Sequence, residues 1–224
     1  MSAPDSSQPA AVGCGATPGA AVPAAGSDAG AAPRILYLHG FRSSPQSFKA
    51  RLLGERLREL GCLDRWYCPA LPASPRAAIE GVLAAFAPGP EDTLIGSSLG
   101  GFYATWLAER TGCRAVLLNP AVRPAQGLAA WVGEQPLFHG GGSFVFEAAY
   151  LDELRAMETA ITRPQRYFLV AATGDELLDW RDMVAHYPGA RHRVIQGSDH
   201  GLSDFAHYQD EVLAFAGIDP RTAR

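Results

Sequence analysis

Asp92-Thr-Leu-Ile-Gly-Ser-Ser-Leu-Gly-Gly-Phe-Tyr-Ala-Thr-Trp106 is the segment from which the architecture of the chain can be predicted. Its first residues form an apolar run typical of a buried strand, and its last residues carry apolar side chains at helical spacing. Between them, Gly96 and Gly100 stand two residues before and two residues after Ser98. A very tight strand-to-helix turn leaves no room for side chains at those two positions. The segment therefore predicts a strand, a strained turn with Ser98 at its apex, and a helix.

This turn has the pattern of a nucleophile elbow, in which the apex serine attacks a carbonyl carbon. The following helix directs its free N–H groups and the positive end of its dipole at the turn, where an anionic intermediate would form. We therefore take Ser98 as the candidate nucleophile and the Leu99 N–H as one oxyanion donor. The alternative is an ordinary glycine-rich turn, because the Gly-x-Ser-x-Gly pentapeptide alone is not specific.

Composition places the chain among globular proteins and excludes several function classes. The 224 residues are 47% hydrophobic and 19% charged, with a formal net charge of −4. The basic residues are scattered, so we expect no nucleic-acid binding. No apolar run approaches the length of a membrane-spanning helix, and the first residues lack the basic and apolar regions of a secretory signal, so we expect no membrane association and a cytoplasmic location. The sequence gives no indication of oligomeric state.

The four cysteines have neither the spacing of metal ligands nor that of a disulfide framework. They are Cys14, Cys62, Cys68 and Cys113. We expect them to be reduced, with no metal and no cofactor bound.

The chain is predicted to hold one domain between two tails. Residues 1–33 are mostly Ala, Gly, Pro and Ser, a composition that predicts a disordered tail. The domain spans 34–218, and 219–224 form a short C-terminal tail. Within the domain, apolar strand-like runs alternate with helical patterns and no hairpin signal is apparent, which predicts an α/β fold with a doubly wound, mostly parallel sheet of about six strands. The predicted strands are 35–38, 64–68, 92–97, 113–120, 167–172 and 191–196. The predicted helices are 46–60, 75–87, one from just after Ser98 to near Gly112, 180–187 and 203–216.

Residues 121–163 interrupt this alternation. A connection of that length exceeds an ordinary crossover, so we predict a small cap insertion over the active-site face. Two helical patterns, 125–132 and 147–160, flank a glycine-rich segment. The aromatic and aliphatic side chains that would give the cap an apolar underside are Trp131, Leu137, Phe138, Phe144, Phe146 and Tyr150. Alternatively, these side chains pack the crossover helices against the sheet.

A serine nucleophile needs a general base and a carboxylate that orients the base. In a parallel α/β sheet these groups come from the carboxyl ends of other strands. Asp175 follows the predicted strand 167–172, and His200 follows the predicted strand 191–196. The order Ser98, Asp175, His200 is that of an α/β-hydrolase triad. Glu176, Asp179 and Asp199 are the competing carboxylates, and His39, His139, His186, His192 and His207 are the competing histidines, all of which fit the triad positions less well.

The loop after the first strand should supply the second oxyanion donor, and the Phe41 N–H occupies that position. His39, Arg123, Trp131 and Phe138 are the candidate substrate-binding residues. For Arg123 two interpretations stay open: it binds an anionic group of the substrate, or it anchors the cap by an ion pair, and the second is favoured.

Five stretches together resemble the YqiA-like esterases, a bacterial branch of the α/β-hydrolases. They are Leu36-Tyr-Leu-His-Gly-Phe-Arg-Ser-Ser-Pro45, Ile95 through Leu107, Asn119-Pro-Ala-Val-Arg-Pro124, Thr173 through Asp179, and Gly197 through His200. They run in order from about 35 to 216, and the first 33 residues are an extension beyond them. The resemblance implies a cofactor-free hydrolase of carboxylic esters or thioesters, with Ser98, Asp175 and His200 at the triad positions.

These observations predict a serine esterase that works through an acyl-enzyme intermediate on a small-molecule ester. Two alternatives remain. An acyl-CoA thioesterase would use the same triad, and a catalytically silent binding module would use the fold without the chemistry.

Overall fold

A six-stranded parallel sheet runs through the computed structural model, which describes residues 32–222. The strand order is β2-β1-β3-β4-β7-β8, and every neighbouring pair is parallel. The predicted six-stranded, doubly wound sheet is therefore confirmed. Its strands are β1 (Ile35–Leu38), β2 (Trp66–Tyr67), β3 (Thr93–Ser97), β4 (Arg114–Leu118), β7 (Tyr167–Ala172) and β8 (Arg191–Ile195).

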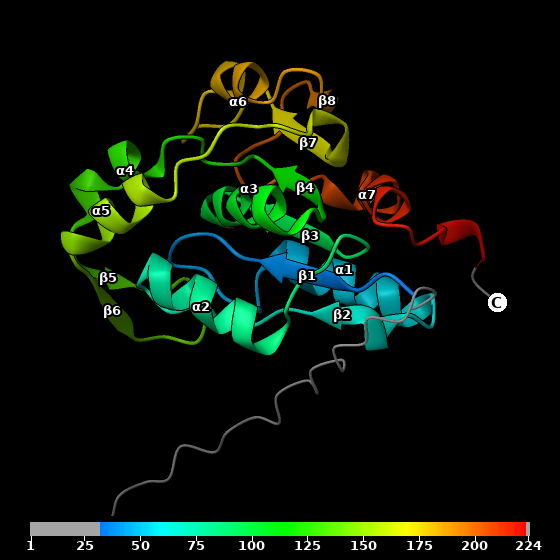
Figure 1. Cartoon of the computed structure of the whole chain (residues 1–224), viewed down its shortest axis with the longest axis horizontal. Helices are drawn as coiled ribbons and strands as arrows, with labels where there is room; N and C mark the ends of the chain where they lie inside the picture. The colour runs from blue at the N-terminus through cyan, green and yellow to red at the C-terminus, as the bar shows by residue number, and fades with distance from the viewer. Residues whose placement is uncertain (1–31, 223–224) are drawn as a thin grey trace, which may run out of the picture.

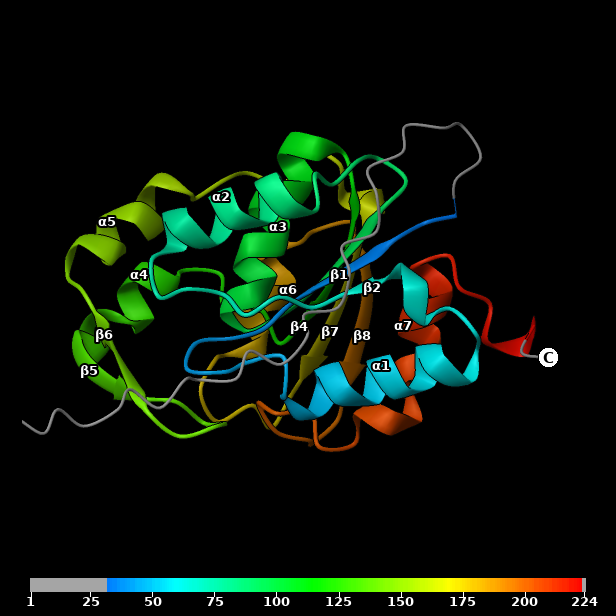
Figure 2. The same ribbon diagram turned by 90° about the horizontal axis from the view of Figure 1, so that it is seen from below.

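Helices cover both faces of the sheet (Figure 1). In the second view, α1 (Phe48–Glu59) and α7 (Gln209–Phe215) lie on one face, and the other face carries α2 (Pro75–Ala85), α3 (Leu99–Thr111) and α6 (Trp180–His186) (Figure 2). Successive side chains of a strand point to opposite faces, so each strand serves two cores. In β1, Leu36 and Leu38 pack with the α2 and α3 side, whereas Ile35 and Tyr37 pack with the α1 and α7 side.

The helix ends follow local signals in the sequence. The side chain of Ser74 accepts a hydrogen bond from the Ala77 N–H at 3.1 Å and caps α2, whose first residue is a proline. Gly112 ends α3 in a left-handed conformation with φ 79°. These ends lie within a few residues of the predicted ones.

Two predicted elements are shorter than expected. The strand expected at 64–68 is only two residues long, because Leu63–Arg65 form a 3-10 turn, η1. The helix expected at 203–216 is divided into a 3-10 turn, η4 (Phe205–His207), and α7. Phe205 and Tyr208 are both buried, with ring centroids 5.4 Å apart, and Tyr208 has a non-helical backbone. The chain therefore buries these two rings and does not continue as one helix through Tyr208.

The segment between β4 and β7 holds the largest difference from the sequence prediction. It contains an antiparallel hairpin in the glycine-rich stretch between the two predicted helices, where no strand was predicted. The glycines 140–142 all have φ between 70° and 87°, and the Leu137 N–H donates to the Gly142 carbonyl at 3.0 Å to close the loop. The elements of the segment are α4 (Pro124–Gly127), η2 (Ala129–Trp131), β5 (Gly133–Pro136), β6 (Ser143–Phe146), α5 (Ala149–Ala156) and η3 (Pro164–Arg166).

The predicted tail of residues 1–33 lies outside the described residues except for its last two. At the other end, a 3-10 turn, η5 (Pro220–Thr222), occupies half of the predicted C-terminal tail. Within residues 32–222, no helix has both the length and the apolar character needed to cross a bilayer.

Candidate active site

Ser98 lies at the turn between β3 and α3 with φ 54° and ψ −120°, a conformation that non-glycine residues rarely adopt. The turn is tight enough to exclude side chains on both sides. A Cβ at Gly96 would lie 2.2 Å from the Gly100 carbonyl oxygen, and a Cβ at Gly100 would lie 1.9 Å from the Leu38 carbonyl oxygen. Both glycines are therefore required for the close approach of α3 to β1 and β3. The backbone at Ser98 is that of the predicted elbow.

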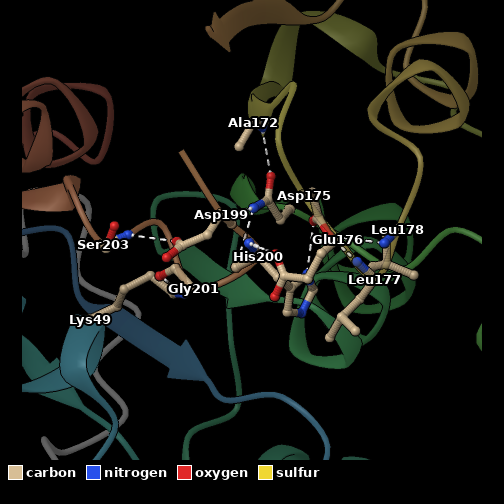
Figure 3. A network of polar contacts seen from close by, with 11 residues as sticks. Lys49, Ala172, Asp175, Glu176, Leu177, Leu178, Asp199, His200, Gly201 and Ser203 are labelled. Carbon is tan, nitrogen blue, oxygen red and sulfur yellow. Dashed lines mark hydrogen bonds and ion pairs between the residues drawn. The ribbon is translucent and has the colours of Figure 1, made fainter. Parts of the chain in front are cut away.

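Asp175 and His200 come together from the ends of β7 and β8 (Figure 3). The distance from His200 Nδ1 to Asp175 Oδ2 is 2.8 Å, and the Asp175 side chain is fully buried. Its other oxygen, Oδ1, accepts the N–H groups of Leu177 and Leu178, each at 2.9 Å. Because a carboxylate can only accept, Nδ1 of His200 carries the proton and Nε2 is left with a free lone pair. That is the tautomer that a general base for a serine requires.

Two side chains that sequence reasoning did not single out hold the loop that carries His200. Asn119 Nδ2 donates to the carbonyls of Asp199 and His200, at 3.0 and 3.2 Å, and its Oδ1 accepts the Ala172 N–H at 2.8 Å. Lys49 Nζ donates to the Gly201 carbonyl at 2.5 Å. Two signals in the sequence could have pointed to these residues. Asn119 is a polar residue at the end of a buried strand, and Lys49 lies among the apolar positions of α1.

The competing carboxylates have other partners. Glu176 Oε2 accepts the backbone N–H of His200 at 2.9 Å. Asp179 caps α6 by accepting the Arg181 N–H at 2.8 Å, and Asp199 Oδ1 accepts the Ser203 N–H at 2.9 Å. Of the carboxylates considered, Asp175 has the bond to the His200 ring.

Ser98 and His200 both line one cavity of about 840 Å³. Its walls come from the loops after β1, β3, β4, β7 and β8, which is the edge of the sheet where the predicted site residues were expected. Phe41 and Leu99 are part of the wall, and a Cβ at Gly40 would lie 3.7 Å from Ser98 Oγ. The predicted oxyanion donors therefore come from segments that lie against the serine.

The cap segment contributes Arg123, Trp131 and Phe138 to this cavity. Phe41 packs edge-on against Trp131, Phe144 and Phe146 at centroid distances of 6.4, 5.5 and 5.1 Å. Arg42 lies over the Phe138 ring at 4.4 Å and donates from Nε to the Pro136 carbonyl at 2.7 Å. The hairpin is thus fixed to the loop after β1. Phe138 and Trp131 keep 62% and 42% of their surface exposed, so they are free to contact a ligand.

His39 does not line the cavity, contrary to its prediction as a substrate-binding residue. Its ring is buried, Nε2 accepts the Leu71 N–H at 3.1 Å, and Nδ1 lies 3.1 Å from the Gly40 carbonyl. Burial lowers the pKa of His39, which keeps the ring neutral and able to accept this bond. The residue joins two loops and has no free nitrogen for a substrate.

Arg123 forms no ion pair within residues 32–222, so the favoured interpretation as an ionic anchor of the cap is wrong. It lines the main cavity and an adjoining cavity of about 350 Å³ that also contains His186 and Glu158. Burial and then the charge of Arg123 lower the pKa of His186.

The cysteines in the described part of the chain are free, and Cys14 lies outside it. Burial raises the pKa of Cys68 to about 12 and that of Cys113 to about 11, so neither thiol is activated as a nucleophile. No cluster of three metal-ligating side chains occurs within residues 32–222.

Comparison with known proteins points to one family and one fold. Residues 34–217 match the family described as "Uncharacterised protein family (UPF0227)". A structure from Agrobacterium vitis S4 aligns with TM-score 0.59 and 20% identity, over 82% of this chain and 88% of its own. The esterase domain of a Rhodothermus marinus protein aligns with TM-score 0.55 and 23% identity, over 87% and 89%. Mouse alpha/beta hydrolase domain-containing protein 10 aligns with TM-score 0.54 and 18% identity, over 83% and 91%. At these identities the likeness shows a shared α/β-hydrolase fold.

Proposed function

The chain belongs to the UPF0227 family, the YqiA-like family that its motifs resemble, and we propose that it is a serine esterase acting on carboxylic esters. The observation that carries the proposal is the His200–Asp175 bond of 2.8 Å beside a cavity that Ser98 and His200 share. A serine in a strained turn, a base with a free nitrogen and a buried carboxylate are the parts that acyl transfer needs.

In the proposed reaction, Ser98 Oγ attacks the ester carbonyl carbon while its proton moves to His200 Nε2. The N–H groups of Phe41 and Leu99 donate to the oxyanion of the tetrahedral intermediate. The C–O bond to the alcohol then breaks, and the alcohol leaves with the proton from His200. Water attacks the acyl-enzyme by the same route, giving up one proton to His200, and releases the carboxylic acid and free Ser98.

The cavity walls indicate the class of substrate. Trp131 and Phe138 offer exposed aromatic surface, which favours an acyl or aromatic group, and we assign both to substrate binding. Arg123 has no carboxylate partner among the described residues, which favours the other interpretation, in which it binds an anionic group of the substrate.

The test is hydrolysis of p-nitrophenyl esters of increasing acyl length by the wild type, Ser98→Ala and Ser97→Ala. Loss of the nucleophile should lower kcat by roughly 10⁴-fold or more, whereas the adjacent serine should matter less than about fivefold. A fluorophosphonate should label the wild type at Ser98 only. Comparing each ester with the thioester of the same acyl chain distinguishes an esterase from an acyl-CoA thioesterase. Comparing an ester of a neutral acyl chain with one whose chain ends in a carboxylate tests whether Arg123 binds an anionic group.

A wild type that hydrolyses neither class and is not labelled at Ser98 would contradict the proposal. The catalytically silent binding module would then be the better description of the chain.

A further inference from the structure

Lys49 is the only lysine of the 224-residue chain, and the other 18 of the 19 basic residues are arginines. It is also buried, with 8% of its surface exposed. Its position explains the burial, because it precedes Leu53 and Leu57 by four and eight residues on the face of α1 that packs against the sheet. A charged side chain on an apolar stripe costs stability unless it has a specific partner.

The partner of Lys49 is the backbone of the loop that carries His200 (Figure 3). Its Nζ donates to the Gly201 carbonyl at 2.5 Å. The two preceding carbonyls, of Asp199 and His200, accept from Asn119 at the end of β4. Three successive carbonyls of this loop are therefore held by side chains from two other elements. Lys49 is the hydrogen-bond donor from α1, and it also lines the cavity that Ser98 and His200 share.

Several titratable groups surround the ammonium group of Lys49. Asp199, in the loop after β8, and Asp175, in the loop after β7, attract its charge, and neither lies close enough for an ion pair. His200, Glu176 and Tyr37 line the same cavity. Burial of Lys49 outweighs the two carboxylates and lowers its pKa to about 8.

We propose that Lys49 is a positioning residue for the general base: its ammonium group holds the Gly201 carbonyl so that the His200 ring stays aimed at Ser98. The proposal rests on the proposed esterase function. Lysine suits this place because its ammonium group is a compact donor on a flexible stem.

The activity test compares kcat and KM for a short p-nitrophenyl ester in the wild type, Lys49→Met and Lys49→Arg. Lys49→Met removes the donor and the charge with little change in volume, so kcat should fall about 10- to 100-fold with a KM change below about threefold. Lys49→Arg keeps a hydrogen-bond donor at this position, so its kcat should lie closer to that of the wild type than the kcat of Lys49→Met does.

Two results would overturn the inference. One is a Lys49→Met enzyme with kcat within about threefold of the wild type. The other is an equally large loss of kcat in both variants, because loss of the hydrogen bond alone predicts that an arginine donor restores part of the activity.

A second measurement does not depend on esterase activity. Protein labelled with ¹³C at the lysine Cε gives one lysine signal, and its titration reports the pKa of Lys49. The midpoint should lie near pH 8 in the wild type and lower in Asp175→Asn, because one of the two carboxylates that favour the ammonium form has been removed. Asp64→Asn, on the distant turn η1, is the control and should leave the midpoint unchanged. A midpoint at the ordinary value, or one that Asp175→Asn does not move, would refute the coupling even if the protein hydrolyses no ester.

Discussion

At the scale of single residues, the neighbouring Asp175 and Glu176 contact different groups of His200, and mutation of each can test this difference. Asp175 accepts the ring Nδ1–H of His200, whereas Glu176 accepts the backbone N–H of the same residue. In Asp175→Asn, the side-chain amide can donate to Nδ1, which favours the tautomer with its proton on Nε2 and removes the acceptor for Ser98. We expect kcat to fall by roughly 10³- to 10⁴-fold.

Glu176→Gln is the matched control, because an amide oxygen can still accept the backbone N–H. Its kcat should stay within about fivefold of the wild type. The measurement is steady-state kinetics of the two variants with one p-nitrophenyl ester. An equal loss of kcat in both variants would contradict the proposed role of Asp175.

The residues that sequence reasoning placed in the site share one property: their chemistry is indicated by chain order and local spacing. Ser98 has its two glycines, and Asp175 and His200 each follow a predicted strand. Lys49 and Asn119 act on a loop that is respectively 152 and about 80 residues away, so no local pattern identifies them. The expectation for His39 was wrong for the same reason, because its partner Leu71 is 32 residues distant.

At the scale of elements, the loop of the β5–β6 hairpin brings two residues, Phe138 and His139, to the cavity wall. Phe138 lines the cavity, is 62% exposed and lies under Arg42. Phe138→Ala should leave folding intact, since little buried surface is lost. We expect kcat/KM for long-chain esters to fall about tenfold, with KM carrying most of the change, while the acetate ester loses less than about threefold.

Val145→Ala, in the same hairpin, is the control. This residue is 59% exposed and does not line the cavity, so its chain-length profile should match that of the wild type. A Phe138→Ala profile that also matches the wild type would mean that the hairpin does not contact the acyl chain.

The central elements could be predicted because their signals are strong and local. β1 and β7 are buried on both faces and appear in the sequence as uninterrupted apolar runs. The hairpin could not be recognised so easily, because its strands hold Gly133, Pro136 and Ser143, which have low strand propensity. Its stability comes from the fit of Phe144 and Phe146 against Phe41, a contact across about a hundred residues.

At the scale of the whole molecule, the buried Lys49 should make the free energy of unfolding depend on pH. The pKa of Lys49 is lowered to about 8 in the folded chain, whereas the pKa of a lysine in the unfolded chain lies near its ordinary value of 10.5. Between those values the unfolded chain binds the extra proton, and stability rises with pH wherever the unfolded state binds more protons. Lys49 therefore costs the folded state free energy below pH 8, and this cost disappears as the pH rises to about 10.5.

Urea unfolding of the wild type and Lys49→Met at intervals from pH 7 to pH 10 measures this contribution. Other groups titrate in the same range, so the quantity to follow is the difference in unfolding free energy between the two proteins. From pH 7 to pH 10, the unfolding free energy of the wild type should rise relative to that of Lys49→Met by on the order of 2 kcal/mol. The reason is that a pKa lowered by one on folding corresponds to about 1.4 kcal/mol. A constant difference would mean that Lys49 titrates alike in the folded and unfolded chains, which would contradict the expected cost of burying its ammonium group.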